Sequence, residues 1–98
     1  MAQFEFKITI GTDMHPEAVN GVVVSVLAQN GIEGFISTAG TECWRGETLP
    51  VRIITWEQEA PRMIGLAHVR RIGEDIGKLL NARFVCAQAN EVQFAEIV

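Results

Sequence analysis

Polar and apolar side chains alternate along residues 3–10, near the start of the chain. The apolar members fall on one side of an extended backbone: Phe4, Phe6, Ile8 and Ile10. A period of two residues is that of a half-buried β-strand. The pattern therefore predicts a first strand over residues 3–10 whose apolar side faces a core, followed by a turn at residues 11–13.

The next stretch places apolar side chains three and four residues apart, which is the spacing of an amphipathic helix. Pro16, after His15, marks its start, and Asn30 with Gly31 marks its end after about residue 29. Its apolar stripe consists of Val19, Val22, Val23, Val26 and Leu27. Because valine has a poor helix propensity, burial must supply much of the stability of this helix.

A second amphipathic pattern predicts a helix that begins at Ala60-Pro61 and ends at Asn81. Its buried stripe consists of Val69, Ile72, Ile76, Leu79 and Leu80. Three glycines lie on nearly one side of this helix: Gly65, Gly73 and Gly77. Each glycine costs up to about 1 kcal/mol relative to alanine in a helix interior, so we expect close packing on that side.

The remaining apolar stretches predict strands over residues 34–43, 50–57 and 83–89, with residues 91–98 as a short fifth strand or arm. The element order is then strand-helix-strand-strand-helix-strand, the split βαβ arrangement of ferredoxin-like domains. We expect one α+β domain over residues 1–98, with both helices on one face of a four-stranded antiparallel sheet. Right-handed crossovers place the first and third strands at its centre.

The strand over residues 50–57 carries bulky apolar side chains on both faces. If Val51, Ile53 and Phe84 face the helices, the opposite side chains form an apolar patch on the open face. That predicted patch consists of Ile54, Trp56, Val85 and Ala87. Because monomers seldom expose such a patch, we expect self-association through Ile54, Trp56 and Val85. The alternative cover is the chain's own residues 91–98.

Two charged side chains lie beside this predicted patch on the first strand. Glu5 and Lys7 point to the face opposite Phe4 and Phe6. They either pair with each other along the strand or mark the polar part of a ligand pocket. We therefore count Glu5 and Lys7 among the candidate binding residues.

Composition narrows the function classes. The chain has 98 residues, of which 48% are hydrophobic and 20% charged, and eight Lys and Arg against twelve Asp and Glu give a net charge of −4. An acidic protein is a poor binder of nucleic acid, because phosphates need neutralising. No apolar run is long enough to span a membrane and no signal peptide is evident, so we expect a cytoplasmic protein.

The charge is unevenly distributed along the chain. Between residues 62 and 83, five basic side chains stand against two acidic ones, so the second helix is a basic stripe on an acidic body. Such a stripe is either a solvated face or a surface for the acidic hairpin of another copy.

The turn predicted at residues 45–48 concentrates candidate binding side chains. Trp44, Arg45 and Glu47 lie at the tip of a hairpin, and Trp with Arg is a common pair at binding hot spots. The alternative is a solvated turn with Arg45 stacked over Trp44.

Nothing in the sequence specifies a metal, a cofactor or a catalytic residue. Cys43 and Cys86 lie far apart without a CxxC motif, so we expect two free, buried thiols. His15 and His68 lack companions at metal-ligand spacing, and His15 fits a position at the start of a helix.

The strand order and the Trp-Arg-Gly-Glu turn within residues 43–51 resemble the trimeric signalling proteins of the PII and CutA type. That resemblance implies a regulatory, self-associating protein. Two other ferredoxin-like groups match less well. The loop at residues 11–15 has neither the phosphate-binding arginine of acylphosphatases nor the CxxC of heavy-metal-binding domains.

The main hypothesis is a non-catalytic regulatory protein that self-associates through the open face and binds a protein partner or small ligand at its hairpin. The first alternative is a small acidic inhibitor or adaptor of phage type that docks on a basic host protein. The second alternative is a small dimeric ferredoxin-like enzyme with Glu5, His15 or His68 as proton carriers.

Overall fold

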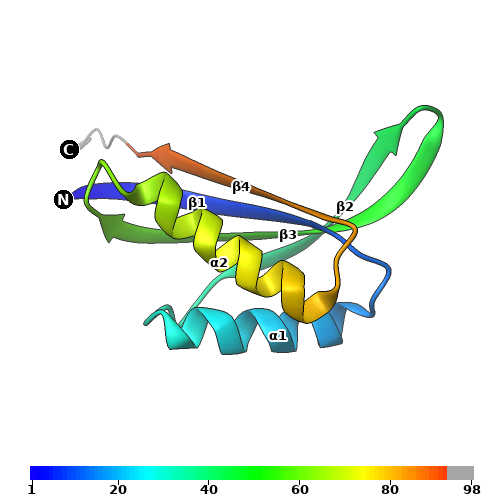
Figure 1. Ribbon diagram of the computed structural model, residues 1–98, viewed down its shortest axis with the longest axis horizontal. Helices are drawn as coiled ribbons and strands as arrows, with labels where there is room; N and C mark the ends of the chain where they lie inside the picture. The colour runs from blue at the N-terminus through cyan, green and yellow to red at the C-terminus, as the bar shows by residue number, and fades with distance from the viewer. Residues whose placement is uncertain (93–98) are drawn as a thin grey trace, which may run out of the picture.

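The computed structural model describes residues 1–92 and has the predicted element order (Figure 1). The elements are β1 (Ala2–Gly11), α1 (Pro16–Gln29), β2 (Ile36–Trp44), β3 (Glu47–Ala60), α2 (Gly65–Leu80) and β4 (Phe84–Glu91). The predicted fifth strand or arm falls almost wholly on residues 93–98, outside the described residues. Neither helix of the described chain has the length and hydropathy that a bilayer crossing demands.

The four strands form one antiparallel sheet in the order β2-β3-β1-β4, so β1 and β3 are central as predicted. One core cluster joins the apolar side of β1 with buried residues of both helices, which places α1 and α2 on the same face. This confirms the ferredoxin-like α+β fold, and within residues 1–92 no helix covers the opposite sheet face.

Helix boundaries follow local chemistry. The imidazole Nδ1 of His15 accepts a hydrogen bond from the backbone N–H of Glu17 at 3.2 Å, which caps α1 next to Pro16. Asn81 ends α2 with a left-handed backbone at φ 50°. The predicted start of the second helix was too early, because β3 continues to Ala60 and residues 61–64 form turns before α2.

The register of the sheet corrects the predicted faces of the central strands. Residues directly opposite in an antiparallel pair share a face. Trp56 lies opposite Phe6 and Ile54 lies opposite Ile8, so both point toward the helices. Ile54 is 0% and Trp56 4% exposed, and Val85 packs partly buried against the same core. The prediction that Ile54, Trp56 and Val85 lie on the open face is wrong.

The open face instead receives Ile53 and Phe84, which lie opposite Thr9 and Gly11. Both alternating sets of side chains in residues 51–56 are apolar, so a shift of one residue exchanges the faces without changing the pattern. Burying the larger set against the helices removes more apolar area from water.

The glycines of α2 pack closely, as predicted. A Cβ added at Gly65 would lie 2.7 Å from the Phe4 ring, and one added at Gly77 would lie 2.8 Å from the Val85 side chain. At Gly73 the nearest atom, also of Val85, would be 3.3 Å away. The glycines therefore let α2 approach β1 and β4 more closely than residues with side chains would allow.

The hairpin of β2 and β3 projects well beyond the rest of the molecule (Figure 1). Its two-residue turn has positive φ at both positions, Arg45 at 51° and Gly46 at 80°, as a type I′ turn requires. The turn is therefore shorter than the predicted one, and β3 begins at Glu47.

Polar side chains fix the base of the hairpin to the body. The Arg83 guanidinium donates a hydrogen bond to the Pro50 carbonyl oxygen at 2.7 Å. Arg52 Nε donates to the Ser37 hydroxyl at 2.8 Å, and that hydroxyl donates to Asn20 Oδ1 on α1 at 2.6 Å. The body thus holds the base, while the tip extends into solvent.

Candidate functional site

The open face of the sheet carries an unusual pair of like charges near its centre. Glu5 on β1 lies directly opposite Glu57 on β3. Both side chains are exposed, and neither makes an ion pair with another described residue. Like charges that face each other across a strand pair destabilise a sheet. A pairing that weakens the fold is a reason to look for a function at this position.

A cavity of about 300 Å³ lies beside these two carboxylates. Phe35 and Ile36 form part of its wall, at the point where the chain leaves α1 and enters β2. Its remaining lining residues are Glu5, Gly34, Thr55, Trp56 and Glu57. The volume falls at the lower end of the roughly 300–1,000 Å³ range of small-molecule sites.

The lining gives this cavity a definite chemical preference. Glu5 and Glu57 supply two negative charges, which attract a cation. Phe35 and Ile36 supply an aromatic and an aliphatic surface for a flat apolar group. The cavity therefore suits a small cationic molecule with an aromatic portion, and we call it the carboxylate cavity.

The structure separates the predicted binding residues into two groups. Trp44, Arg45 and Glu47 lie at the hairpin tip, where β2 ends and β3 begins. Glu5 lies opposite Glu57, near the other end of β3, and Lys7 lies two residues further along β1. The five residues therefore cannot form one site within a single copy.

The hairpin tip is a solvated turn with one stacked pair. Trp44 is 61% exposed, and the Arg45 guanidinium lies 5.5 Å from its ring centroid. Cys43 and Cys86 are free as predicted, but both are exposed, so the prediction of buried thiols is wrong. Both lie on outer strands, where side chains have few neighbours.

The two histidines lie outside the carboxylate cavity. The His15 imidazole caps α1, and His68 Nε2 lies 3.1 Å from Gln58 Oε1 beneath α2. Partial burial, and then the charge of Arg71, lower the pKa of His68. Of the three proton carriers considered in the enzyme alternative, Glu5 lines the carboxylate cavity and the two histidines do not. Within residues 1–92, no three His, Cys, Asp or Glu side chains gather closely enough to ligate a metal ion.

Sequence reasoning missed Glu57 and Phe35 as site residues. The signal for Glu57 was the strand register, because aligning β1 with β3 brings it opposite Glu5. No comparable signal exists for Phe35, which lies in the connection between α1 and β2. Its position depends on how that connection crosses the end of the sheet.

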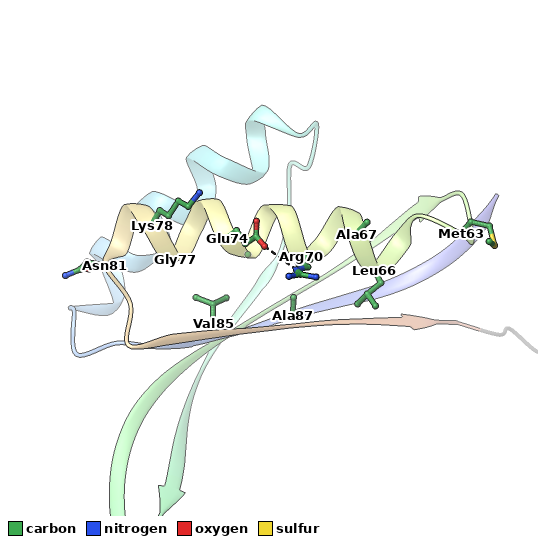
Figure 2. Close-up of a pocket in the computed structure, with 11 residues that line it drawn as sticks. Met63, Leu66, Ala67, Arg70, Glu74, Gly77, Lys78, Asn81, Val85 and Ala87 are labelled. Atoms are coloured by element: carbon green, nitrogen blue, oxygen red, sulfur yellow. Dashed lines mark hydrogen bonds and ion pairs between the residues drawn. The ribbon is translucent and has the colours of Figure 1, made fainter.

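A second, larger hollow runs between α2 and the outer strand β4 (Figure 2). It has a volume of about 1,000 Å³, and Val85 and Ala87 of β4 point into it below the helix (Figure 2). Arg70, Glu74 and Lys78 on α2 border it, and Arg70 forms an ion pair with Glu74 at 3.2 Å (Figure 2). We call it the α2-β4 groove.

Comparison with known proteins yields structural matches only. No family model and no curated protein matches the chain. The structure of a phage SAM lyase in its apo state has a TM-score of 0.58 at 12% identity, over 95% of this chain and 92% of that one. A phage SAM lyase in complex with S-methyl-5′-thioadenosine has a TM-score of 0.60 at 17% identity, over 92% and 81%. A de novo designed protein with a ferredoxin fold has a TM-score of 0.49 at 18% identity, over 100% and 93%.

These matches correct the main functional hypothesis. The solved structures with TM-scores of 0.58 and 0.60 belong to an enzyme, so the expectation of a non-catalytic regulatory protein is wrong. They agree better with the enzyme alternative. At identities of 12% and 17%, the likeness itself establishes the shared fold.

Proposed function

We propose that this chain is an enzyme that binds S-adenosylmethionine in the carboxylate cavity and cleaves it, releasing S-methyl-5′-thioadenosine. The observation that carries the proposal is the opposed pair Glu5 and Glu57 at a cavity with an aromatic wall. The fold shared with a SAM lyase supplies the substrate class.

The substrate fits the chemistry of the cavity. S-adenosylmethionine carries a positive sulfonium and a positive ammonium group, and two carboxylates are the matching protein groups. Its adenine is a flat aromatic ring that can pack against Phe35 and Ile36. A cationic substrate also accounts for the opposed carboxylates, because its positive charge would offset the repulsion between Glu5 and Glu57.

The reaction breaks the bond between sulfur and the carbon chain of the methionine portion. Sulfur keeps the electron pair, loses its positive charge and leaves as a neutral thioether. As this bond breaks, the carbon fragment either loses a proton from the adjacent carbon to a protein base, which leaves a carbon–carbon double bond, or forms a bond from its own carboxylate oxygen to the carbon that leaves sulfur. Neither route consumes water. Glu5 and Glu57 are the candidate bases, because they are the ionisable groups that line the cavity.

Mass spectrometry of a reaction mixture tests the proposal. Purified protein incubated with S-adenosylmethionine should release S-methyl-5′-thioadenosine faster than a sample without protein. We expect Glu5→Gln and Glu57→Gln each to lower kcat/KM at least about 10-fold. Glu59→Gln is the matched control, because Glu59 is an exposed carboxylate on the same strand that does not line the cavity.

Two results would overturn the proposal. One is release no faster than without protein, at full loading with substrate. The other is release that is unchanged by both cavity variants. The identity of the second product distinguishes proton loss from ring closure.

The second candidate function is that of a phage-type inhibitor or adaptor. The excess of acidic residues outside α2 favours it, because a negative surface suits a basic host protein. The resemblance to trimeric PII and CutA proteins remains a proposal about assembly, as does the cytoplasm as the place of action. An adaptor predicts no turnover of S-adenosylmethionine and a salt-sensitive complex with one defined host protein.

A further inference from the structure

Among the described residues that line the carboxylate cavity, Trp56 alone belongs to the buried core. Its ring lies 5.5 Å from the ring of Phe6 on β1, at an interplanar angle of 41°. A buried indole carries an N–H group that needs an acceptor. The shape of the cavity wall therefore depends on the group that accepts this hydrogen bond.

Gln58 supplies the acceptor. Trp56 Nε1 donates a hydrogen bond to Gln58 Oε1 at 3.2 Å. Because an indole N–H can only donate, the atom of the Gln58 amide that faces it must be the oxygen. His68 Nε2 lies 3.1 Å from the same oxygen, so His68 must donate to it as well. A neutral His68 therefore carries its proton on Nε2.

These two hydrogen bonds join α2 to the cavity wall. Gln58 lies opposite Phe4, on the sheet face that packs against the helices, and His68 lies on α2. The imidazole of His68 also meets the ring of Phe6 edge-on, at 5.6 Å between centroids. Neither Gln58 nor His68 lines the carboxylate cavity, so we expect them to affect a bound molecule through Trp56.

We infer that Gln58 and His68 are positioning residues that hold the Trp56 indole as a fixed wall for the adenine of S-adenosylmethionine. This inference rests on the proposed function. A wall that is already fixed loses little conformational freedom when a ligand packs on it. Because adenine does not take part in bond breaking, the wall contacts it equally in the ground state and the transition state. Losing the hydrogen bonds should therefore raise KM and leave kcat unchanged.

Steady-state kinetics of Gln58→Leu tests the inference, because leucine has a similar size and no acceptor. We expect KM for S-adenosylmethionine to rise about 3- to 10-fold, with kcat within about twofold of the wild type. A merely structural role predicts less folded enzyme, and therefore a lower kcat at an unchanged KM. Gln88→Leu is the matched control. Gln88 is an exposed glutamine of the same sheet that does not line the cavity, and its variant should keep both constants.

Two variants of His68 keep the test decisive should Gln58→Leu fail to fold. His68→Leu removes the donor to Gln58, whereas His68→Gln retains an N–H that can donate. KM should rise in His68→Leu and stay within about twofold of the wild type in His68→Gln.

A double-mutant cycle assigns the effect to the indole. Trp56→Phe keeps an aromatic ring but has no N–H, so Gln58→Leu should change KM much less in that background. Fluorescence gives a readout without turnover. In a Trp44→Phe background Trp56 is the remaining tryptophan, and its emission should change when S-methyl-5′-thioadenosine is added at concentrations that inhibit cleavage.

The inference is overturned if Gln58→Leu folds and keeps the wild-type KM, or if His68→Leu and His68→Gln have the same KM. It is also overturned if inhibition by S-methyl-5′-thioadenosine leaves the emission of Trp56 unchanged. In each of these cases the wild type still cleaves S-adenosylmethionine, so the proposed function stands. A wild type that does not cleave S-adenosylmethionine overturns the proposed function first, and this inference with it.

Discussion

At the scale of single residues, the space around a glycine Cα determines how a substitution by alanine changes the free energy of unfolding. Gly77 lies against Val85, whose branched side chain is stiff, whereas a Cβ at Gly21 on α1 would meet no atom within 4 Å. Gly77→Ala should therefore lower the free energy of unfolding by about 1–3 kcal/mol. Gly21→Ala should raise it by up to about 1 kcal/mol through helix propensity. Urea denaturation of both variants checks these signs, and equal effects would contradict the packing argument.

His68 gives a second prediction at this scale. Its pKa is lowered by burial and then by Arg71, so the unfolded chain binds a proton more readily than the folded protein. Stability should therefore fall as the pH drops through about 6.5. The pKa of Glu91 is lowered by its hydrogen bond with Arg62, which affects stability only at more acidic pH.

His68→Gln tests this dependence, because glutamine can still donate a hydrogen bond to Gln58 without titrating. Thermal melts between about pH 7.5 and about pH 5.5 should show a smaller loss of Tm in the variant than in the wild type. Equal slopes would mean that other groups cause the loss.

At the scale of elements, the junction of β1 and β4 depends on a glycine beneath an aromatic ring. A Cβ at Gly11 would lie 2.2 Å from the ring of Phe84, its partner across the strands. Gly11→Ala should cost about 1–3 kcal/mol of stability. Because the clash is with one ring, the same substitution in a Phe84→Ala background should cost much less. A double-mutant cycle with no coupling would rule out this packing.

The order and type of the elements followed from the sequence, because residues 3–10 alternate strictly and the helices have regular apolar stripes. The face of β3 did not, since both sides of residues 51–56 are apolar and only the register with β1 distinguishes them. The make-up of the carboxylate cavity depends on the same register between β1 and β3. Glu5 was identified as a candidate from its polar face, but its partner Glu57 depends on a pairing between residues 52 positions apart in the chain.

At the scale of the whole molecule, stability and association are linked. If copies join through their outer strands, association favours the folded state, and Tm should increase with protein concentration. The Tm of Thr41→Pro should not, because this variant removes a backbone N–H that points to the free edge of β2. Differential scanning calorimetry over a wide concentration range measures both, and a wild-type Tm independent of concentration would contradict the linkage.

The opposed carboxylates of Glu5 and Glu57 lower the stability of the fold at the site of the proposed activity. Glu5→Gln should raise the free energy of unfolding by roughly 0.2–1 kcal/mol, because it relieves a repulsive cross-strand pair. If the proposed cleavage of S-adenosylmethionine holds, the same change should lower kcat/KM at least about 10-fold, so the more stable protein is the less active one. A search for heat-resistant variants of this chain would then tend to select against the proposed activity, with Glu5 and Glu57 among the altered positions.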